Sequence, residues 1–234
     1  MSWLEPLNGN PLPWLLEAGD PDVHYCTLRD LFDRPPDDPE LAAARRAAHV
    51  SGPIPAILAH MDPQGWWNVP EAGYLPKYTS TVWSLILLAQ LGASVHEDRR
   101  IERACQYLVD HALTEGGQFT SSSGPSGAID CLQGNLCWAL MELGYEHPRL
   151  ESAYEWMAMT VTGDGIAPKE EKDAPVRYFA YKCGPTFACG ANNKLPCAWG
   201  GCKVMMAFGK LSTKKQTPLV KKSHQTRCRL LPRC

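Results

Sequence analysis

The sequence predicts an all-α protein assembled from repeated pairs of helices. Three observations support this fold class: strand-type alternation is nearly absent, apolar residues recur at helical spacing, and a Gly-containing turn followed by a loop and an apolar helix occurs three times. The apolar helices are expected at residues 79–91, 131–143 and 197–211. Helices that are apolar on most sides are buried, so we expect each to be the inner member of a pair with an amphipathic outer helix.

Two sets of landmarks give the length of the repeat. Residues 100–104 (RIERA) align with residues 149–153 (RLESA), 49 positions later, and the Leu-Gly pairs that end the first two apolar helices lie 52 positions apart. Landmarks that agree on about 50 residues indicate an internal repeat. We expect inner-helix positions to be buried and outer-helix charges to be exposed. The inner positions are Leu85, Leu88, Leu136, Leu140, Val204 and Ala207, and the outer charges are Arg99, Arg103 and Glu151.

The remaining elements follow from proline, glycine and periodicity signals. Residues 1–21 are rich in proline and glycine and predict an irregular N-terminal arm. A short helix at 24–33 is ended by Arg34-Pro35-Pro36, because proline lacks an amide donor and restricts the residue before it. Further helices are expected at 39–50 and 54–61, with the amphipathic outer helices at 98–112 and 148–159.

The repeat domain is expected to span residues 22–222, followed by an atypical tail at 223–234. The repeat calls for an alanine at position 223 and an amphipathic continuation, whereas the chain has Ser223 and ends on Pro-Arg-Cys. With standard codons, a one-base shift in the adenine-rich Lys221-Lys222 codons gives K-A-I-K-Q-G-V-D-F-F-L-A, which restores both features. We therefore expect a frameshifted, C-terminally truncated product with a loosely packed tail. In such a product the apolar flank of the last inner helix, Val204–Phe208, would be exposed and available for self-association.

Composition excludes several classes of function. The chain has 234 residues, 44% of them apolar, and a formal charge of −2, so it can build a large core and gives no electrostatic case for binding nucleic acid. Its longest apolar run is far shorter than the roughly 18–20 residues that span a bilayer, so no membrane span is expected. The N-terminus lacks the basic region of a signal peptide. We therefore expect a cytoplasmic protein whose ten cysteines are reduced thiols.

The turns between outer and inner helices carry a resemblance to a known superfamily. The segments are AILAH (56–60) before QGW (64–66), YLVDH (107–111) before EGGQF (115–119), and WM (156–157) before GDG (163–165). Over roughly residues 22–222 this pattern resembles the α/α toroid of terpenoid cyclases and protein prenyltransferases. The resemblance implies an incomplete barrel of concentric helices, in which the N-termini of the inner helices surround a cavity for an isoprenoid or another apolar small molecule.

The resemblance also directs attention to zinc. Prenyltransferases of this superfamily hold zinc through an Asp-x-Cys pair and a histidine, whereas here Asp130 and Cys131 are adjacent and no histidine accompanies Cys197. Cys131 and Cys197 begin successive inner helices, where free amides stabilise a thiolate, so with Asp130 they are candidate zinc ligands. Three further cysteines could complete the ligand shell: Cys183, Cys189 and Cys202. Ordinary core or loop thiols are the alternative for all five cysteines.

Three tryptophans are candidate cavity-lining residues. Trp83, Trp138 and Trp199 each lie in a different inner helix, where they could line an apolar cavity, although ordinary helix packing is the preferred explanation. Two functions follow from these features. The first is an isoprenoid- or lipid-handling, enzyme-like protein, whose activity, if any, would be of prenyltransferase or terpenoid cyclase type. The alternative is a non-catalytic helical-repeat scaffold that binds a partner or a metal ion.

Overall fold

The computed structural model describes residues 4–17, 19–122, 124–179, 183–184, 187–188 and 193–230, with side chains in the last segment described as far as residue 226. The expected all-α class is confirmed in these residues. Apart from isolated β-bridges, such as the one between Leu113 and Phe119, their regular structure is helical. None of the helices in these ranges is both long enough and apolar enough to cross a lipid bilayer.

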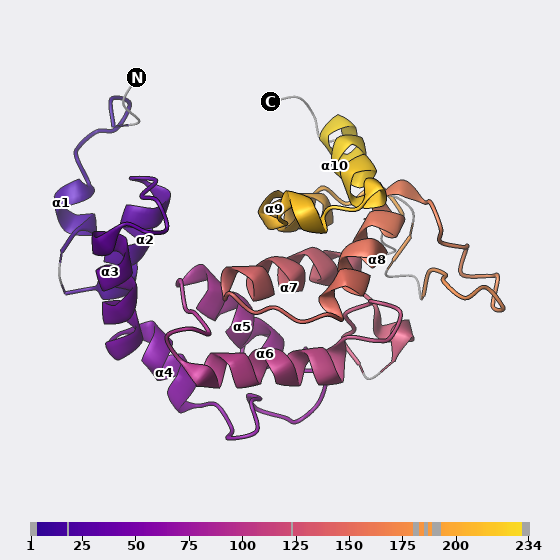
Figure 1. Cartoon of the computed structure of the whole chain (residues 1–234), viewed down its shortest axis with the longest axis horizontal. Coiled ribbons are helices and arrows are strands. Elements are labelled where there is room, and N and C mark those ends of the chain that lie inside the picture. The colour runs from indigo at the N-terminus through magenta and orange to yellow at the C-terminus, as the bar shows by residue number, and fades with distance from the viewer. Residues whose placement is uncertain are drawn as a thin grey trace.

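The helices occur close to the expected positions (Figure 1). The N-terminal part contains α1 (Leu12–Leu15), α2 (Pro21–Asp30), α3 (Pro39–Val50) and α4 (Pro53–Ala59). The three apolar helices are α5 (Thr81–Gln90), α7 (Asp130–Glu142) and α9 (Ala198–Lys210). Each is followed by a second helix, namely α6 (Arg99–Ala112), α8 (Leu150–Thr162) and α10 (Pro218–Leu230), and short 3₁₀ turns lie at Pro125–Gly127 and Thr213–Lys215.

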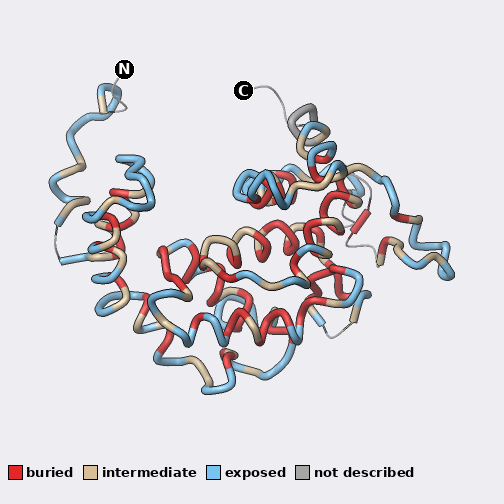
Figure 2. Tube along the Cα trace, in the orientation of Figure 1, coloured by how far each residue is buried: buried red, intermediate tan, exposed pale blue. Residues whose placement is uncertain are grey.

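The inner positions that the sequence predicts on α5, α7 and α9 are buried, in a core to which α6 and α8 also contribute. The six inner positions, Leu85, Leu88, Leu136, Leu140, Val204 and Ala207, are all 0% exposed. The three outer charges, Arg99, Arg103 and Glu151, are exposed. Figure 2 shows the buried residues running through the central helices and exposed residues covering much of α9. Packing of apolar faces therefore holds the array together.

The helices α5, α7 and α9 lie side by side and point in the same direction. A Cβ atom on Gly134 of α7 would lie 2.5 Å from the amide nitrogen of Val204 in α9, and one on Gly200 would lie 3.7 Å from the Cβ of Cys131. Early residues of α7 therefore meet early residues of α9. At the other end, the Val95 amide after α5 donates to the Leu143 carbonyl after α7 over 2.9 Å. The N-termini of the three helices consequently share one end of the layer.

Two glycine turns pack against the outer helices at related positions. Gly65 has φ +102°, and a Cβ on it would lie 2.8 Å from the Arg103 carbonyl oxygen in α6. Gly117 has φ +85°, and a Cβ on it would lie 2.1 Å from the Ser152 carbonyl oxygen in α8. The alignment by an offset of 49 equates Arg103 with Ser152. Both turns need glycine for the left-handed backbone and for this close approach.

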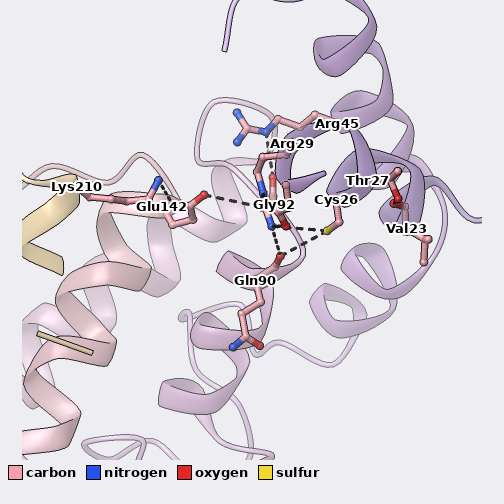
Figure 3. Close-up of polar contacts among 10 residues, drawn as sticks. Val23, Cys26, Thr27, Arg29, Arg45, Gln90, Gly92, Glu142 and Lys210 are labelled. Carbon is pink, nitrogen blue, oxygen red and sulfur yellow. Dashed lines mark hydrogen bonds and ion pairs between the residues drawn. The ribbon is translucent and has the colours of Figure 1, made fainter. Parts of the chain in front are cut away.

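The N-terminal helices pack at the C-terminal ends of the apolar helices. Arg29 of α2 donates to the Gln90 carbonyl at the end of α5 over 3.3 Å, and Arg45 of α3 donates to the Gly92 carbonyl over 3.1 Å. The Tyr25 ring packs so closely that a Cβ on Gly92 would lie 1.9 Å from it. Figure 3 shows the two arginine contacts converging near the end of α5. Cationic side chains thus satisfy carbonyl groups that a helix C-terminus leaves without partners.

The termini differ from the expectations in three ways. The arm at 1–21 contains the short helix α1, and α2 begins at Pro21. The helix α10 continues across the expected boundary at residue 222, because no proline or glycine interrupts residues 219–230 and the buried stripe continues from Val220 to Ser223, which is 0% exposed. Residues 231–234 of the expected tail lie outside the described residues. The frameshift concerns the gene and stays a prediction.

The expected exposed apolar flank at Val204–Phe208 is wrong for most of its residues. Val204 and Ala207 are 0% exposed and Phe208 is 1% exposed, whereas Met206 is 50% exposed. The buried residues belong to the main core cluster, to which α10 contributes Val220 and Leu219. Packing of α9 against α7, where Val204 meets Gly134, and against α10 explains their burial.

Candidate functional site

Each apolar helix leaves one stripe partly exposed, and together the three stripes define a surface that we call the inner face. Its residues recur at the spacing of one helix side. They are Trp83 and Leu87 on α5, Cys131, Asn135 and Trp138 on α7, and Trp199, Lys203 and Met206 on α9. The opposite sides of these helices carry the fully buried leucine, valine and alanine positions of the core.

The tryptophans of the inner face differ in environment. The Trp83 indole donates to the Tyr74 carbonyl over 2.9 Å, and its ring lies 5.1 Å from that of Tyr78. Trp138 is half-buried against the core, whereas Trp199 is 68% exposed. The structure therefore places all three expected tryptophans on partly exposed helix sides. Among the described residues, the cavities found next to α2 and next to α4 lie away from Trp138 and Trp199.

Lys203, which was not among the expected site residues, is the cation of the inner face. Its Nζ donates to Oδ1 of Asn135 on α7 over 2.5 Å and lies 4.4 Å from the centroid of the Trp199 ring. Burial lowers the pKa of Lys203, while the nearby Cys131 thiol acts in the opposite direction. A cation–π contact of this kind holds the ammonium over the indole. The spacing of Trp199 and Lys203 in one helix was a local signal for the cation–π contact. Asn135, the hydrogen-bond partner of Lys203, is 68 residues away in the sequence and gave no local signal.

The first turns of α7 and α9 bring together Cys131 and Cys197, as the alignment of the two helices predicts. Cys197 is the N-cap of α9, and its Sγ accepts a hydrogen bond from the Gly200 amide over 3.4 Å. Cys131 lies on the other side of Gly200, where a Cβ on that glycine would be 3.6 Å from the Cys131 Cα. Both residues are partly exposed. The absence of a side chain at position 200 allows the two cysteines to flank one turn of α9.

Two of the other expected metal ligands form hydrogen bonds with the backbone. Asp130 is the first residue of α7 rather than its cap, which is Ile129, and its buried Oδ2 accepts from the Gly184 amide over 3.2 Å. The Cys183 thiol donates to the Phe179 carbonyl over 2.5 Å.

Cys202 is exposed, and Cys189 lies outside the described residues. Across the ranges that the structure describes, no three His, Cys, Asp or Glu side chains gather in a way that could hold a metal ion. Zinc binding stays a prediction.

Sequence reasoning also missed a charged group at the opposite end of the helices. Glu142 ends α7 with a side chain that is 8% exposed, and it forms ion pairs with Lys210 of α9 and, over 3.9 Å, with Arg29 of α2 (Figure 3). Two cations offset the unfavourable position of a carboxylate at a helix C-terminus. The partners are 68 and 113 positions away in the sequence, so local patterns gave no signal for this group.

Comparisons with protein-family models, with curated proteins and with solved structures each found no match. The chemistry of the site therefore has to be inferred from its own residues: an apolar, aromatic surface with one cation and two thiols near the N-termini of α7 and α9.

Proposed function

We propose that the protein is an open, toroid-like array of helix pairs with a repeat of about 50 residues, and that its inner face binds an isoprenoid or another apolar chain. The observation that carries this proposal is the tryptophan on the partly exposed side of each apolar helix. Supporting the repeat, Gly65 and Gly117 pack against aligned positions of α6 and α8. The protein would handle an isoprenoid or lipid, and the type of reaction, if any, is left open.

The position of the positive charge on the inner face suggests how such a ligand would be oriented. Lys203 and the N-termini of α7 and α9 supply positive potential at one side, since free amides at a helix start favour anions. Leu87 and Met206, which are 43% and 50% exposed, provide apolar surface further along α5 and α9. We therefore propose a chain with an anionic head, such as a prenyl diphosphate, with its head near Lys203.

Titration calorimetry with farnesyl diphosphate tests the proposal. Replacing Trp199 with alanine should weaken binding by about tenfold, because an aromatic side chain contributes about 1–2 kcal/mol of contact energy. Trp14→Ala is the matched control, since Trp14 on α1 is 67% exposed and Trp199 is 68% exposed. Lys203→Gln should weaken binding of farnesyl diphosphate more than binding of farnesol. Equal affinities for the Trp199→Ala and Trp14→Ala proteins would contradict the proposal.

A second candidate is a scaffold that docks a protein partner, including a second copy of this chain, on the same face. The exposure of Trp199 and Met206 on α9 favours it, because exposed apolar groups on one helix side mark interaction surfaces. Light scattering over a range of protein concentrations separates the two functions. A concentration-dependent dimer that is lost in Trp199→Ala but kept in Trp14→Ala would support the scaffold.

A further inference from the structure

The helices α2 and α3 form a small unit at one end of the array (Figure 1). Polar contacts join this unit to the segment that follows α5: Arg45 donates to the Gly92 carbonyl over 3.1 Å, and His49 is bonded to the Ser94 amide. A unit with its own apolar cluster can loosen from its neighbour before the whole chain unfolds. Such a cluster, separate from the main core, is formed here by Tyr25, Leu28, Leu41 and Ala44.

The ring of His49 accepts a hydrogen bond from a backbone amide. The Ser94 amide nitrogen lies 3.2 Å from Nε2 of His49. Because a backbone amide only donates, Nε2 has to be without a proton, and the neutral ring carries its proton on Nδ1. This Nδ1 is buried and has no hydrogen-bond partner among the described residues. The contact between α3 and Ser94 therefore requires the neutral form of the ring.

Ser94 lies in the middle of the turn to which α3 is attached. The residue is 3% exposed, its carbonyl accepts from the Asp98 amide over 3.2 Å, and its hydroxyl accepts from the His96 amide over 3.2 Å. The next residue, Val95, donates to the Leu143 carbonyl after α7 over 2.9 Å. A change at the Ser94 amide therefore acts at a turn that contacts α3, the cap of α6 and the end of α7.

Charged groups from three elements surround His49. Arg45 lies on its own helix, Glu97 lies in the turn after α5, and Asp98 and Arg100, at the start of α6, pair with each other over 2.7 Å. Burial is the main effect and lowers the pKa of His49 below the usual 6.5; the two acidic groups oppose this effect and the two arginines add to it. The contact therefore has its full strength well above pH 6.5 and weakens as the pH falls below that value.

We propose that His49 is a pH-sensitive switch, in which uptake of a proton by the ring releases α3 from the turn after α5 and loosens the unit of α2 and α3. A proton on Nε2 converts the acceptor into a donor that faces the donating Ser94 amide, so the hydrogen bond is lost. The protonated ring is also a buried cation whose Nδ1 lacks a partner among the described residues, which is costly. The contacts of Arg29 and Arg45 with backbone carbonyls do not depend on this proton, so we expect a loosened unit rather than a detached one.

An NMR titration of the unaltered protein tests the hydrogen bond itself. At pH 7.5 the ring-nitrogen shifts of His49 should show a proton on Nδ1 and none on Nε2. As the pH is lowered, the Ser94 amide signal should shift with the same midpoint as the ring, and this midpoint should lie below 6.5. A proton on Nε2 at pH 7.5, or a Ser94 amide that does not follow the ring, would overturn the proposal.

Hydrogen exchange tests the release of the unit. Between pH 7.5 and pH 4.5, after correction for intrinsic rates, amides of α2 and α3 should lose about fivefold more protection than those of α8, the factor expected for one lost hydrogen bond. His49→Gln should remove this excess loss, because its side-chain oxygen can accept from the Ser94 amide and does not titrate. His60→Gln is the matched control, since His60 is an exposed histidine at the end of α4. Equal losses in the unaltered protein, or an excess loss that survives in His49→Gln, would contradict the switch.

Discussion

The carboxylate of Asp22 shows how one side chain can set the pH dependence of stability. Its pKa is raised from the usual 3.8 to about 6 in the folded chain, mainly by burial. The folded state therefore binds the proton more tightly than the unfolded state, and stability falls as the pH rises from about 4 through about 6. We expect Asp22→Asn to raise the free energy of unfolding at pH 7.5 by up to about 3 kcal/mol.

Urea denaturation of both proteins at pH 4 and pH 7.5 measures this effect. The gain from Asp22→Asn should shrink towards zero at pH 4, because both side chains are then neutral. Asp37→Asn should leave the stability unchanged at both values, since Asp37 is exposed. A loss of stability in Asp22→Asn at pH 7.5 would mean that the carboxylate has a favourable partner in the folded protein.

At the scale of elements, the contact between α7 and α9 depends on the missing side chain of Gly134. A Cβ at this position would lie 2.5 Å from the Val204 amide nitrogen, so alanine would force the two backbones apart. We expect Gly134→Ala to lower the free energy of unfolding by about 1–3 kcal/mol, measured by urea denaturation.

Gly209 provides the matched control within α9. A Cβ on Gly209 would have no neighbour within 4 Å. Because alanine is the better helix former, Gly209→Ala should raise stability by as much as about 1 kcal/mol near this helix end. If both substitutions raised stability, α7 and α9 would have to be further apart than the structure places them.

The positions of most helices could be predicted because their signals are local. The range 39–50 was correct for α3, since Asp38 caps it and Pro39 starts it. The expected end of α8 at 159 was three residues short, because the decisive signal was Gly163 at φ +78° rather than the apolar pattern. The helix expected from residue 131 begins at Asp130, whose side chain accepts a hydrogen bond from the distant Gly184 amide.

The candidate sites were only partly predictable, for physical reasons that lie in long-range packing. Alignment of two segments sufficed to place Cys131 and Cys197 at one end of neighbouring helices. To predict the contact between Lys203 and Asn135, one must know how each helix is rotated about its axis. Burial patterns define this rotation only coarsely. The burial of Asp22 could not be predicted, because an acidic residue in the first turn of a helix is ordinary and the Gly52 that packs against it lies in another helix cap.

At the scale of the whole molecule, Glu142 connects segments from both halves of the chain. It ends α7 and lies between Arg29 of α2 and Lys210 of α9 (Figure 3). Besides this group, α2 and α3 are attached to the end of α5 through Arg29 and Arg45, which donate to backbone carbonyls. Because Glu142 contacts both α2 and α9, removing its charge should affect these distant segments together.

We therefore expect Glu142→Gln to lower the free energy of unfolding by about 1–2 kcal/mol, because two cations lose a largely buried counter-charge. Hydrogen exchange should become faster in α2 and at the end of α9, while α6 keeps its protection. Glu146→Gln is the matched control: Glu146 pairs with Lys215, but its side chain is 80% exposed, so no measurable change is expected. Faster exchange confined to α7 would show that Glu142 stabilises only its own helix and does not couple the two ends of the array.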